Sequence, residues 1–177
     1  SHYCGNPLAI KIAAAATKNI FDGSIRDFLQ YGTLIFGDLW TIFQQQFDRL
    51  SPLEKTVMYW LAINREWVKL PALKKDIVPA VSPRALLEAV ESLKARSLIE
   101  AGAHGITQQP VVMEYMTERL ITQFYTDLNQ QTFDFLNRYA LIKAQAQDFV
   151  RDAQISLIAQ KLMKRIIDDY ILEKITA

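Results

Sequence analysis

Few side chains in this sequence have both the type and the spacing that catalysis or metal binding requires. His2 and His104 are its two histidines, and neither has a second Cys, His or acidic residue at the spacing of metal ligands. Cys4, the single cysteine, has no base evident beside it, so we do not expect a catalytic thiol. The phosphate-cradling loop Gly-x-x-x-x-Gly-Lys-Ser/Thr does not occur. We therefore expect no catalytic residue, no metal site and no independent enzymatic activity in this chain.

An acidic pair, Asp168–Asp169, is the remaining candidate for acid–base chemistry. Lys164 and Arg165 stand four residues earlier on the same expected helix. Opposite charges at this spacing pair along one face of a helix. We expect these residues to form salt bridges on a helix surface.

Composition and charge describe a soluble globular protein. Half of the 177 residues are hydrophobic, 22% are charged, and the formal net charge is +1. This balance disfavours a broad electrostatic surface for nucleic acid. One cysteine cannot form an internal disulfide, and we find no signal peptide and no apolar run long enough to span a bilayer. We expect a cytoplasmic protein without a membrane partner.

Glycine and proline are sparse and stand mostly where helices begin or end, which predicts a mainly helical protein. In residues 1–50 we expect a small helical bundle. One helix begins at Asn6–Pro7, and another is capped by Ser24. A third begins at Gly37–Asp38 and has apolar residues at i, i+4 and i+8, namely Leu39, Phe43 and Phe47.

Three further helices are expected after residue 50. Residues 51–54, Ser-Pro-Leu-Glu, offer an N-cap, a proline at the first helical position and a capping-box acid. The same start signal recurs at Ser82–Pro83, and a short helix is expected between the two, near Pro71–Ile77. Apolar positions at helical spacing predict that the first and last of these helices each bury one stripe.

A β-hairpin and a long helix complete this region. Two short strands, 97–100 and 106–109, flank a glycine-containing turn. The helix that follows Pro110 has one apolar face, formed by Val112, Met116, Leu120, Phe124 and Leu128. Three helices followed by a hairpin are typical of a winged helix, which we expect over residues 51–130.

Residues 131–177 are expected to form a helical extension with a joint near Tyr139 or Asp148. Its last helix has two adjacent apolar stripes, together wider than a coiled-coil seam. They consist of Ile155, Ile158, Leu162 and Ile166, and of Met163, Ile167, Ile171 and Ile175. We expect them to pack on the helices of residues 132–147. Self-association or docking on a neighbouring domain is the alternative.

A winged helix first suggests DNA binding by the helix that follows Ser82–Pro83. That helix has no Asn or Gln to read bases, and two of its five charged residues are acidic. The five are Arg84, Glu88, Glu91, Lys94 and Arg96. The expected wing tip carries His104 but no Arg or Lys, so nucleic acid is not an expected partner. A winged-helix transcription regulator with a helical dimerisation tail remains the alternative function, and a plain helical interaction module is a third.

Two short motifs resemble those of NB-ARC signalling ATPases of the STAND type. Residues 5–9, Gly-Asn-Pro-Leu-Ala, look like the Gly-x-Pro-Leu-Ala motif that opens a helix in the family's first ARC subdomain. Residues 109–115, Gln-Pro-Val-Val-Met-Glu-Tyr, resemble its His-Pro-Leu-Val-x-Glu-Tyr signature at the end of the winged helix. The resemblance covers residues 3–125. Residues 60–66 and 108–116 are similar to NB-ARC proteins of cyanobacteria, which usually carry a WD40 propeller after the helical region.

The resemblance implies a nucleotide switch in three parts. Residues 1–50 would be a helical segment of the first ARC subdomain, 51–130 the winged helix of the second, and 131–177 a helical linker. The parent protein would be an NTPase that holds ADP between an upstream nucleotide-binding domain and this chain. Exchange for ATP would swing the winged helix away and expose an oligomerisation surface. A downstream WD40 sensor is the other implied partner, and the fragment alone is not expected to bind nucleotide tightly.

The resemblance also implies two nucleotide contacts. Pro7 would lie against the adenine. The alternative is that Pro7 has no ligand contact and only starts a helix, since proline suits the first helical turn. Gln109 stands where the family has a histidine that contacts the β-phosphate of ADP. Its amide can donate a hydrogen bond to phosphate but cannot become cationic. The alternative for Gln109 is that it ends a strand with its side chain in water.

Overall fold

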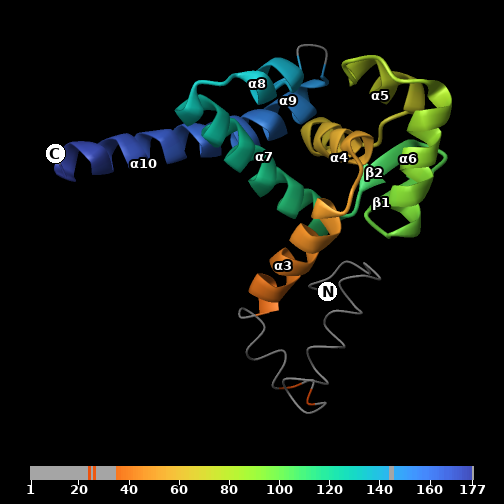
Figure 1. Ribbon diagram of the computed structural model, residues 1–177, viewed down its shortest axis with the longest axis horizontal. Coiled ribbons are helices and arrows are strands. Elements are labelled where there is room, and N and C mark those ends of the chain that lie inside the picture. Colours follow the sequence, from red (N-terminus) through yellow and green to blue (C-terminus); the bar gives the residue numbers. More distant parts are fainter. Residues whose placement is uncertain (1–23, 25, 27–34, 144–145, 177) are drawn as a thin grey trace.

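The computed structural model describes residues 24, 26, 35–143 and 146–176. As predicted, the fold is mainly helical with one small two-stranded antiparallel sheet (Figure 1). The elements are α3 (Ile35–Asp48), α4 (Pro52–Asn64), α5 (Leu70–Asp76), α6 (Pro83–Ala95), β1 (Ile99–Gly102), β2 (Gly105–Gln108), α7 (Pro110–Gln130), α8 (Asp134–Arg138), α9 (Asp148–Gln154), the π-helix η1 (Ile155–Ala159) and α10 (Gln160–Thr176). The expected helices before residue 35 lie outside the described residues.

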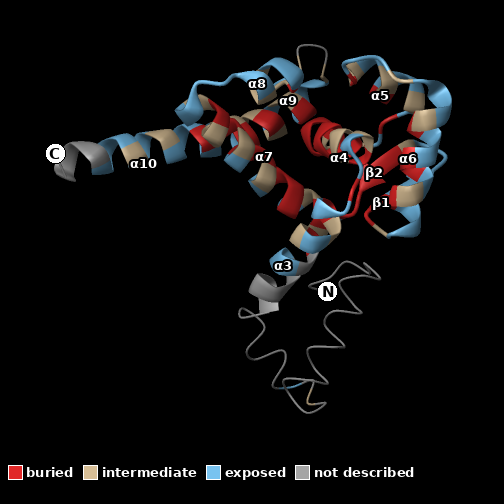
Figure 2. Cartoon of the chain, in the orientation of Figure 1, coloured by how far each residue is buried: buried red, intermediate tan, exposed pale blue. Residues whose placement is uncertain are grey.

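Helix α4 begins with the predicted capping box and forms the centre of the core. Ser51 Oγ accepts the Glu54 N–H at 3.3 Å, and the Glu54 carboxylate accepts the Ser51 N–H at 2.6 Å. Every residue from Val57 to Asn64 is buried, although the sequence predicted a single apolar stripe. Figure 2 shows α4 surrounded by its neighbours, and α6 and α7 both pack on it. A helix buried on all faces must have partners on every side, and the sequence alone did not reveal them.

The hairpin is the predicted wing, and a third short strand segment joins it. β1 and β2 pair from Ile99↔Gln108 to Gly102↔Gly105, so the strands run further into the expected turn than predicted. Val68 then pairs with Ile106 through two backbone hydrogen bonds of 2.8 and 2.9 Å. Gly105 has φ +123°, and a Cβ there would lie 2.3 Å from the Val68 carbonyl oxygen. The wing is therefore held by the backbone that follows α4.

Helix α7 and the elements after it follow the prediction only in part. The expected inward residues of α7, from Val112 to Phe124, are buried. Residues 132–177 are not helical throughout: α8 ends at Arg138 and the next helix begins at Asp148. The predicted joint near Tyr139 or Asp148 falls in this stretch, where the described residues, 139–143 and 146–147, are not helical. Its described residues are tied down because Gln154 accepts the Lys143 N–H at 3.0 Å and donates to Ile63 O at 2.7 Å.

Helix α10 packs on α7, a partner that was not expected from the sequence. Lys161 pairs with Glu118 at 2.9 Å, and the Arg165 guanidinium lies 4.4 Å from the centre of the Tyr125 ring. Asp169 accepts a hydrogen bond from the Tyr125 hydroxyl and so contacts α7. The prediction was that it would pair with the preceding turn of its own helix.

The two apolar stripes of the C-terminal helix differ in burial. Ile158 and Leu162, in the first stripe, are buried. Met163, Ile167 and Ile171, in the second, are about half exposed, and α10 extends away from the rest of the protein (Figure 1). None of the described helices combines the length and the apolar character needed to cross a membrane.

Candidate functional site

Gln109 lies between β2 and α7, at the first residue of the signature segment 109–115. Its backbone is extended (φ −63°, ψ 145°), and its carbonyl accepts the Met113 N–H at 2.8 Å, so it is the N-cap of α7. The residue is only 9% exposed, and its side chain does not cap the helix. Oε1 is buried with no hydrogen-bond partner among the described residues. The low exposure of this residue argues against the alternative that its side chain lies in water.

The unpaired atom of Gln109 is an acceptor, so this end of the carboxamide would meet an anionic oxygen favourably only with its two ends exchanged. The two ends of a carboxamide have the same shape, so a half-turn of the group exchanges an acceptor for a donor. The first N–H groups of α7 have no partner within the helix, and Pro110 contributes none. These groups give the start of the 21-residue helix a partial positive charge. The adjacent Gln108 donates its amide N–H to Met58 O at 2.8 Å, and its Oε1 is likewise buried without a partner among the described residues.

Glu114 of the signature joins α7 to the end of α4. Arg65, the C-cap of α4 with φ +55°, lies 3.7 Å from the Glu114 carboxylate and donates to Thr117 Oγ1 at 2.7 Å. Burial lowers the pKa of the Arg65 guanidinium, and the charge of Glu114 opposes that shift. The motif acid thus compensates a nearly buried cation between the two helices.

Tyr115 of the signature contacts α3. Its hydroxyl donates to Gln44 Oε1 at 3.0 Å, and its ring packs on Trp40 and Phe43 with centroids 5.2 and 5.6 Å away. Burial raises the pKa of the Tyr115 phenol, and Arg119 opposes that shift through its charge and a hydrogen bond.

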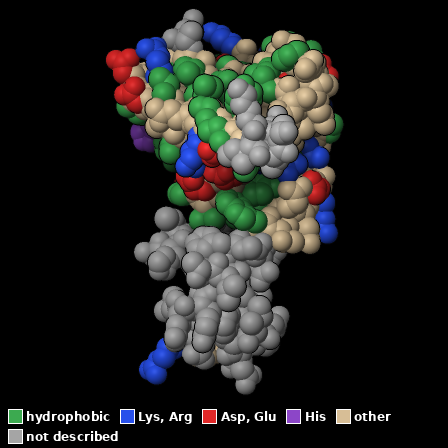
Figure 3. Space-filling model, turned by 90° about the vertical axis from the view of Figure 1, so that its left-hand side faces the viewer, with side chains coloured by type: hydrophobic (Ala, Val, Ile, Leu, Met, Phe, Trp, Pro, Cys, Tyr) green, Lys and Arg blue, Asp and Glu red, His purple; other side chains and the backbone are tan. Residues whose placement is uncertain are grey.

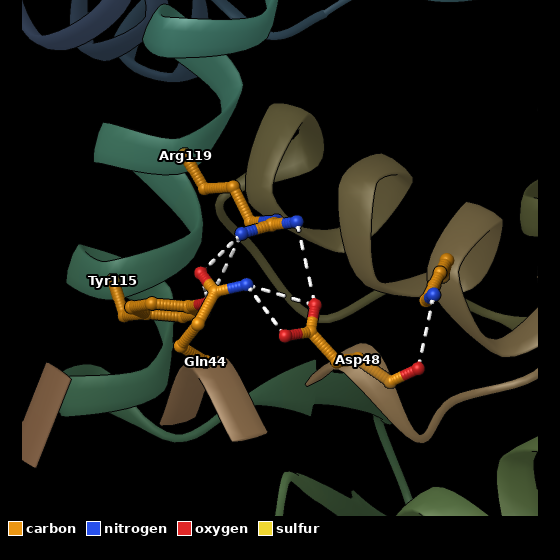
Figure 4. Close-up of polar contacts among 5 residues, drawn as sticks. Gln44, Asp48, Tyr115 and Arg119 are labelled. Atoms are coloured by element: carbon orange, nitrogen blue, oxygen red, sulfur yellow. Dashed lines mark hydrogen bonds and ion pairs between the residues drawn. The ribbon is translucent and has the colours of Figure 1, made fainter. Parts of the chain in front are cut away.

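The Tyr115 hydroxyl belongs to a polar cluster, Gln44, Asp48, Tyr115 and Arg119, which we call the α3–α7 latch (Figure 4). Arg119 Nη1 donates to Gln44 Oε1, and the Gln44 amide donates to both Asp48 carboxylate oxygens at 2.8 and 2.9 Å. This cluster was not recognised from the sequence. The one signal for it was a pair of polar residues at i, i+4 on each helix, Gln44 with Asp48 and Tyr115 with Arg119, and Gln44 and Tyr115 are 71 residues apart in the chain.

The other predicted contact, Pro7, lies outside the described residues, so its proximity to Gln109 stays a prediction. Among the described residues, no three His, Cys, Asp or Glu side chains gather closely enough to hold a metal ion. On the face toward the C-terminal end, basic and acidic side chains are interspersed (Figure 3). On α6, Arg84 pairs with Glu88 at 2.8 Å, so part of the positive charge expected on that helix is neutralised locally.

Comparison with known proteins finds a relative of much greater length. The chain is 42% identical, over an alignment of 206 residues that covers 96% of it, to an uncharacterized WD repeat-containing protein of Nostoc sp. strain PCC 7120. It spans 16% of the length of that protein. No family model and no solved structure matches the chain. The expected association with WD repeats is thus supported by a relative, and the NB-ARC resemblance stays a prediction.

Proposed function

We propose that this chain is the mobile half of an ADP/ATP switch in a larger WD-repeat signalling ATPase of the NB-ARC kind. The observation that carries the proposal is the side chain of Gln109 at the positive end of α7, whose Oε1 is buried without a partner among the described residues. A buried polar group without a partner costs free energy unless a ligand or water satisfies it. A phosphate oxygen is a ligand that fits a carboxamide donor next to a helix N-terminus.

ADP and ATP differ in the number and charge of their phosphates, and in this proposal Gln109 contacts a phosphate. Gln109 would donate its amide N–H to a phosphate oxygen, and the first N–H groups of α7 would add their partial positive charge. Pro7 would lie against the adenine, as the motif resemblance implies. Because a carboxamide carries no charge, this contact would not depend on pH in the range where a histidine titrates.

Helix α7 offers a route from the nucleotide to the rest of the chain. Gln109 begins the helix, Glu114 holds the end of α4, and Tyr115 holds α3. A change of contact at Gln109 would therefore shift a rigid element to which both neighbouring helices are attached. Nucleotides shift such an equilibrium only by the difference in their binding to its two states.

The test uses the parent polypeptide with its upstream nucleotide-binding domain. The release rate of fluorescent ADP is measured for the wild type, Gln109→Ala and Gln109→Glu. Loss of a hydrogen bond to a charged group should speed release about tenfold or more, and a carboxylate should speed it further by repulsion. Gln130→Ala and Gln130→Glu, on the exposed end of the same helix, are the matched controls and should leave release unchanged.

Unchanged ADP release in both Gln109 variants would contradict the proposal. The alternative, a DNA-binding regulator, predicts instead that the chain binds duplex DNA with an affinity that falls steeply as salt rises. A filter-binding titration at two salt concentrations distinguishes the two functions.

A further inference from the structure

The C-terminal half of α3 is part of the winged-helix core. Phe43, Phe47 and Leu50 are at most 4% exposed and belong to the same buried cluster as α4, α6 and α7. The Phe47 ring packs edge-on against Tyr59 of α4, with centroids 5.5 Å apart. Separation of α3 from the winged helix would expose these rings to water, which opposes any motion between the two.

The α3–α7 latch adds polar contacts beside the apolar packing of α3 on the winged helix. Arg119 lies with its guanidinium carbon 4.1 Å from the centre of the Phe47 ring, and its Nη2 is 3.9 Å from Asp48. Its Nη1 also donates to Gln44, so one α7 side chain contacts three residues of α3. A planar guanidinium can stack on a ring and donate in its plane at once, which lysine cannot do.

The connection between α3 and α4 is also fixed. Leu50 N donates to Phe47 O at 3.0 Å, and Lys55 of α4 donates to Asp48 O at 3.2 Å. The next residue, Ser51, is already committed to the capping box of α4. A hinge needs residues whose backbone angles can change, and these contacts oppose such a change at Leu50 and Ser51.

We propose that α3 and the winged helix turn as one rigid body in the switch, fixed by Arg119. This inference rests on the proposed function for its motion, whereas the latch itself is independent of nucleotide.

Distances between spin labels test the proposal. In the parent polypeptide with all its native cysteines, Cys4 included, replaced by serine, labels are placed at Gln45→Cys on α3 and Asn129→Cys on α7, both on exposed positions. We expect one narrow distance distribution, the same with ADP and with ATP. A distance that changes with the nucleotide would overturn the inference, because α3 would then move relative to α7.

The role of Arg119 is tested in the same labelled protein. Arg119→Met should broaden the distribution or add a longer distance, whereas Arg84→Met, which removes an exposed arginine from α6, should not. A narrow, unchanged distribution in Arg119→Met would refute the role of this residue. A second label pair, between the upstream domain and Asn129→Cys, reports the switch itself. If the distance in that second pair is the same with ADP and with ATP, the proposed function fails. The comparison of Arg119→Met with wild type still tests the latch in that case.

Discussion

Lys143 lies with its Nζ 2.7 Å from the Asp76 carboxylate and 2.9 Å from Asn64 Oδ1, and so joins the connection after α8 to the ends of α4 and α5. The two charged side chains are 23% and 15% exposed, which places the pair between a surface and a buried salt bridge. The ammonium group also lies 5.9 Å from the Trp60 ring. The Lys143 side chain therefore adds a second attachment of this connection to the core, beside the hydrogen bond from its backbone N–H to Gln154.

Removal of the Asp76 charge should destabilise the protein. Asp76→Asn leaves a half-buried lysine without its counter-charge, so we expect a loss of about 1–2 kcal/mol in the free energy of unfolding. Urea unfolding followed by circular dichroism measures it. Glu88→Gln, which removes one partner of an exposed ion pair on α6, is the control and should change stability by less than about 0.5 kcal/mol. Equal effects in the two variants would show that the Lys143 pair has no special role.

The elements that could be predicted from the sequence are those determined by local chemistry. The capping box of Ser51 and Glu54, the cap at Ser82 and Pro110 at the start of α7 all involve residues within four positions of each other. The hairpin was recognisable because Gly105 allows its turn. Each of these signals acts within a few residues, so one sequence is enough to find it.

The features that could not be predicted depend on contacts between distant residues. Arg119 and Gln44 are 75 residues apart, and Gln154 and Ile63 are 91 apart. Val68 forms a strand segment only because Ile106 lies opposite, and a single residue has no periodicity to detect. The burial of Gln109 follows from the packing around β2 and α7, whereas a polar side chain at the end of a strand predicts exposure.

Gly105 should tolerate no side chain, unlike its hairpin partner Gly102. Gly105→Ala places a Cβ 2.3 Å from the Val68 carbonyl oxygen at a φ of +123°, so the bridge between Val68 and Ile106 must break. We expect a loss of about 2–4 kcal/mol. Gly102→Ala meets only the Trp67 ring, at 3.7 Å, and should be nearly neutral. Thermal unfolding of both variants measures the difference, and similar melting temperatures would contradict this account of the wing.

The two stripes of the C-terminal helix should respond differently to a charge. Leu162 is 3% exposed against α7, so Leu162→Asp buries a carboxylate and should cost about 3 kcal/mol or more. Ile167 is 48% exposed, and Ile167→Asp introduces the same residue with the same helix propensity. We expect Ile167→Asp to change the unfolding free energy by less than about 1 kcal/mol. If both variants unfold alike, the second stripe must be covered by another surface.

The carboxylate of Asp127 should make stability depend on acid pH. Burial raises the pKa of this group, but hydrogen bonds from Thr132 and from the backbone N–H groups of Leu136 and Phe135 outweigh burial and lower it overall. A carboxyl whose folded pKa is depressed contributes its stability above the unfolded pKa, and that contribution is lost as pH falls through the folded pKa. Wild type should therefore lose stability below about pH 4.

Asp127→Asn isolates this contribution. The variant should be less stable than wild type at neutral pH, and the gap should narrow as the pH falls, because protonation leaves wild type with the same neutral group. Urea unfolding at a series of pH values measures the gap, with Asp152→Asn on an exposed position of α9 as the control. A gap that stays constant with pH would mean that the charge of Asp127 does not hold α8.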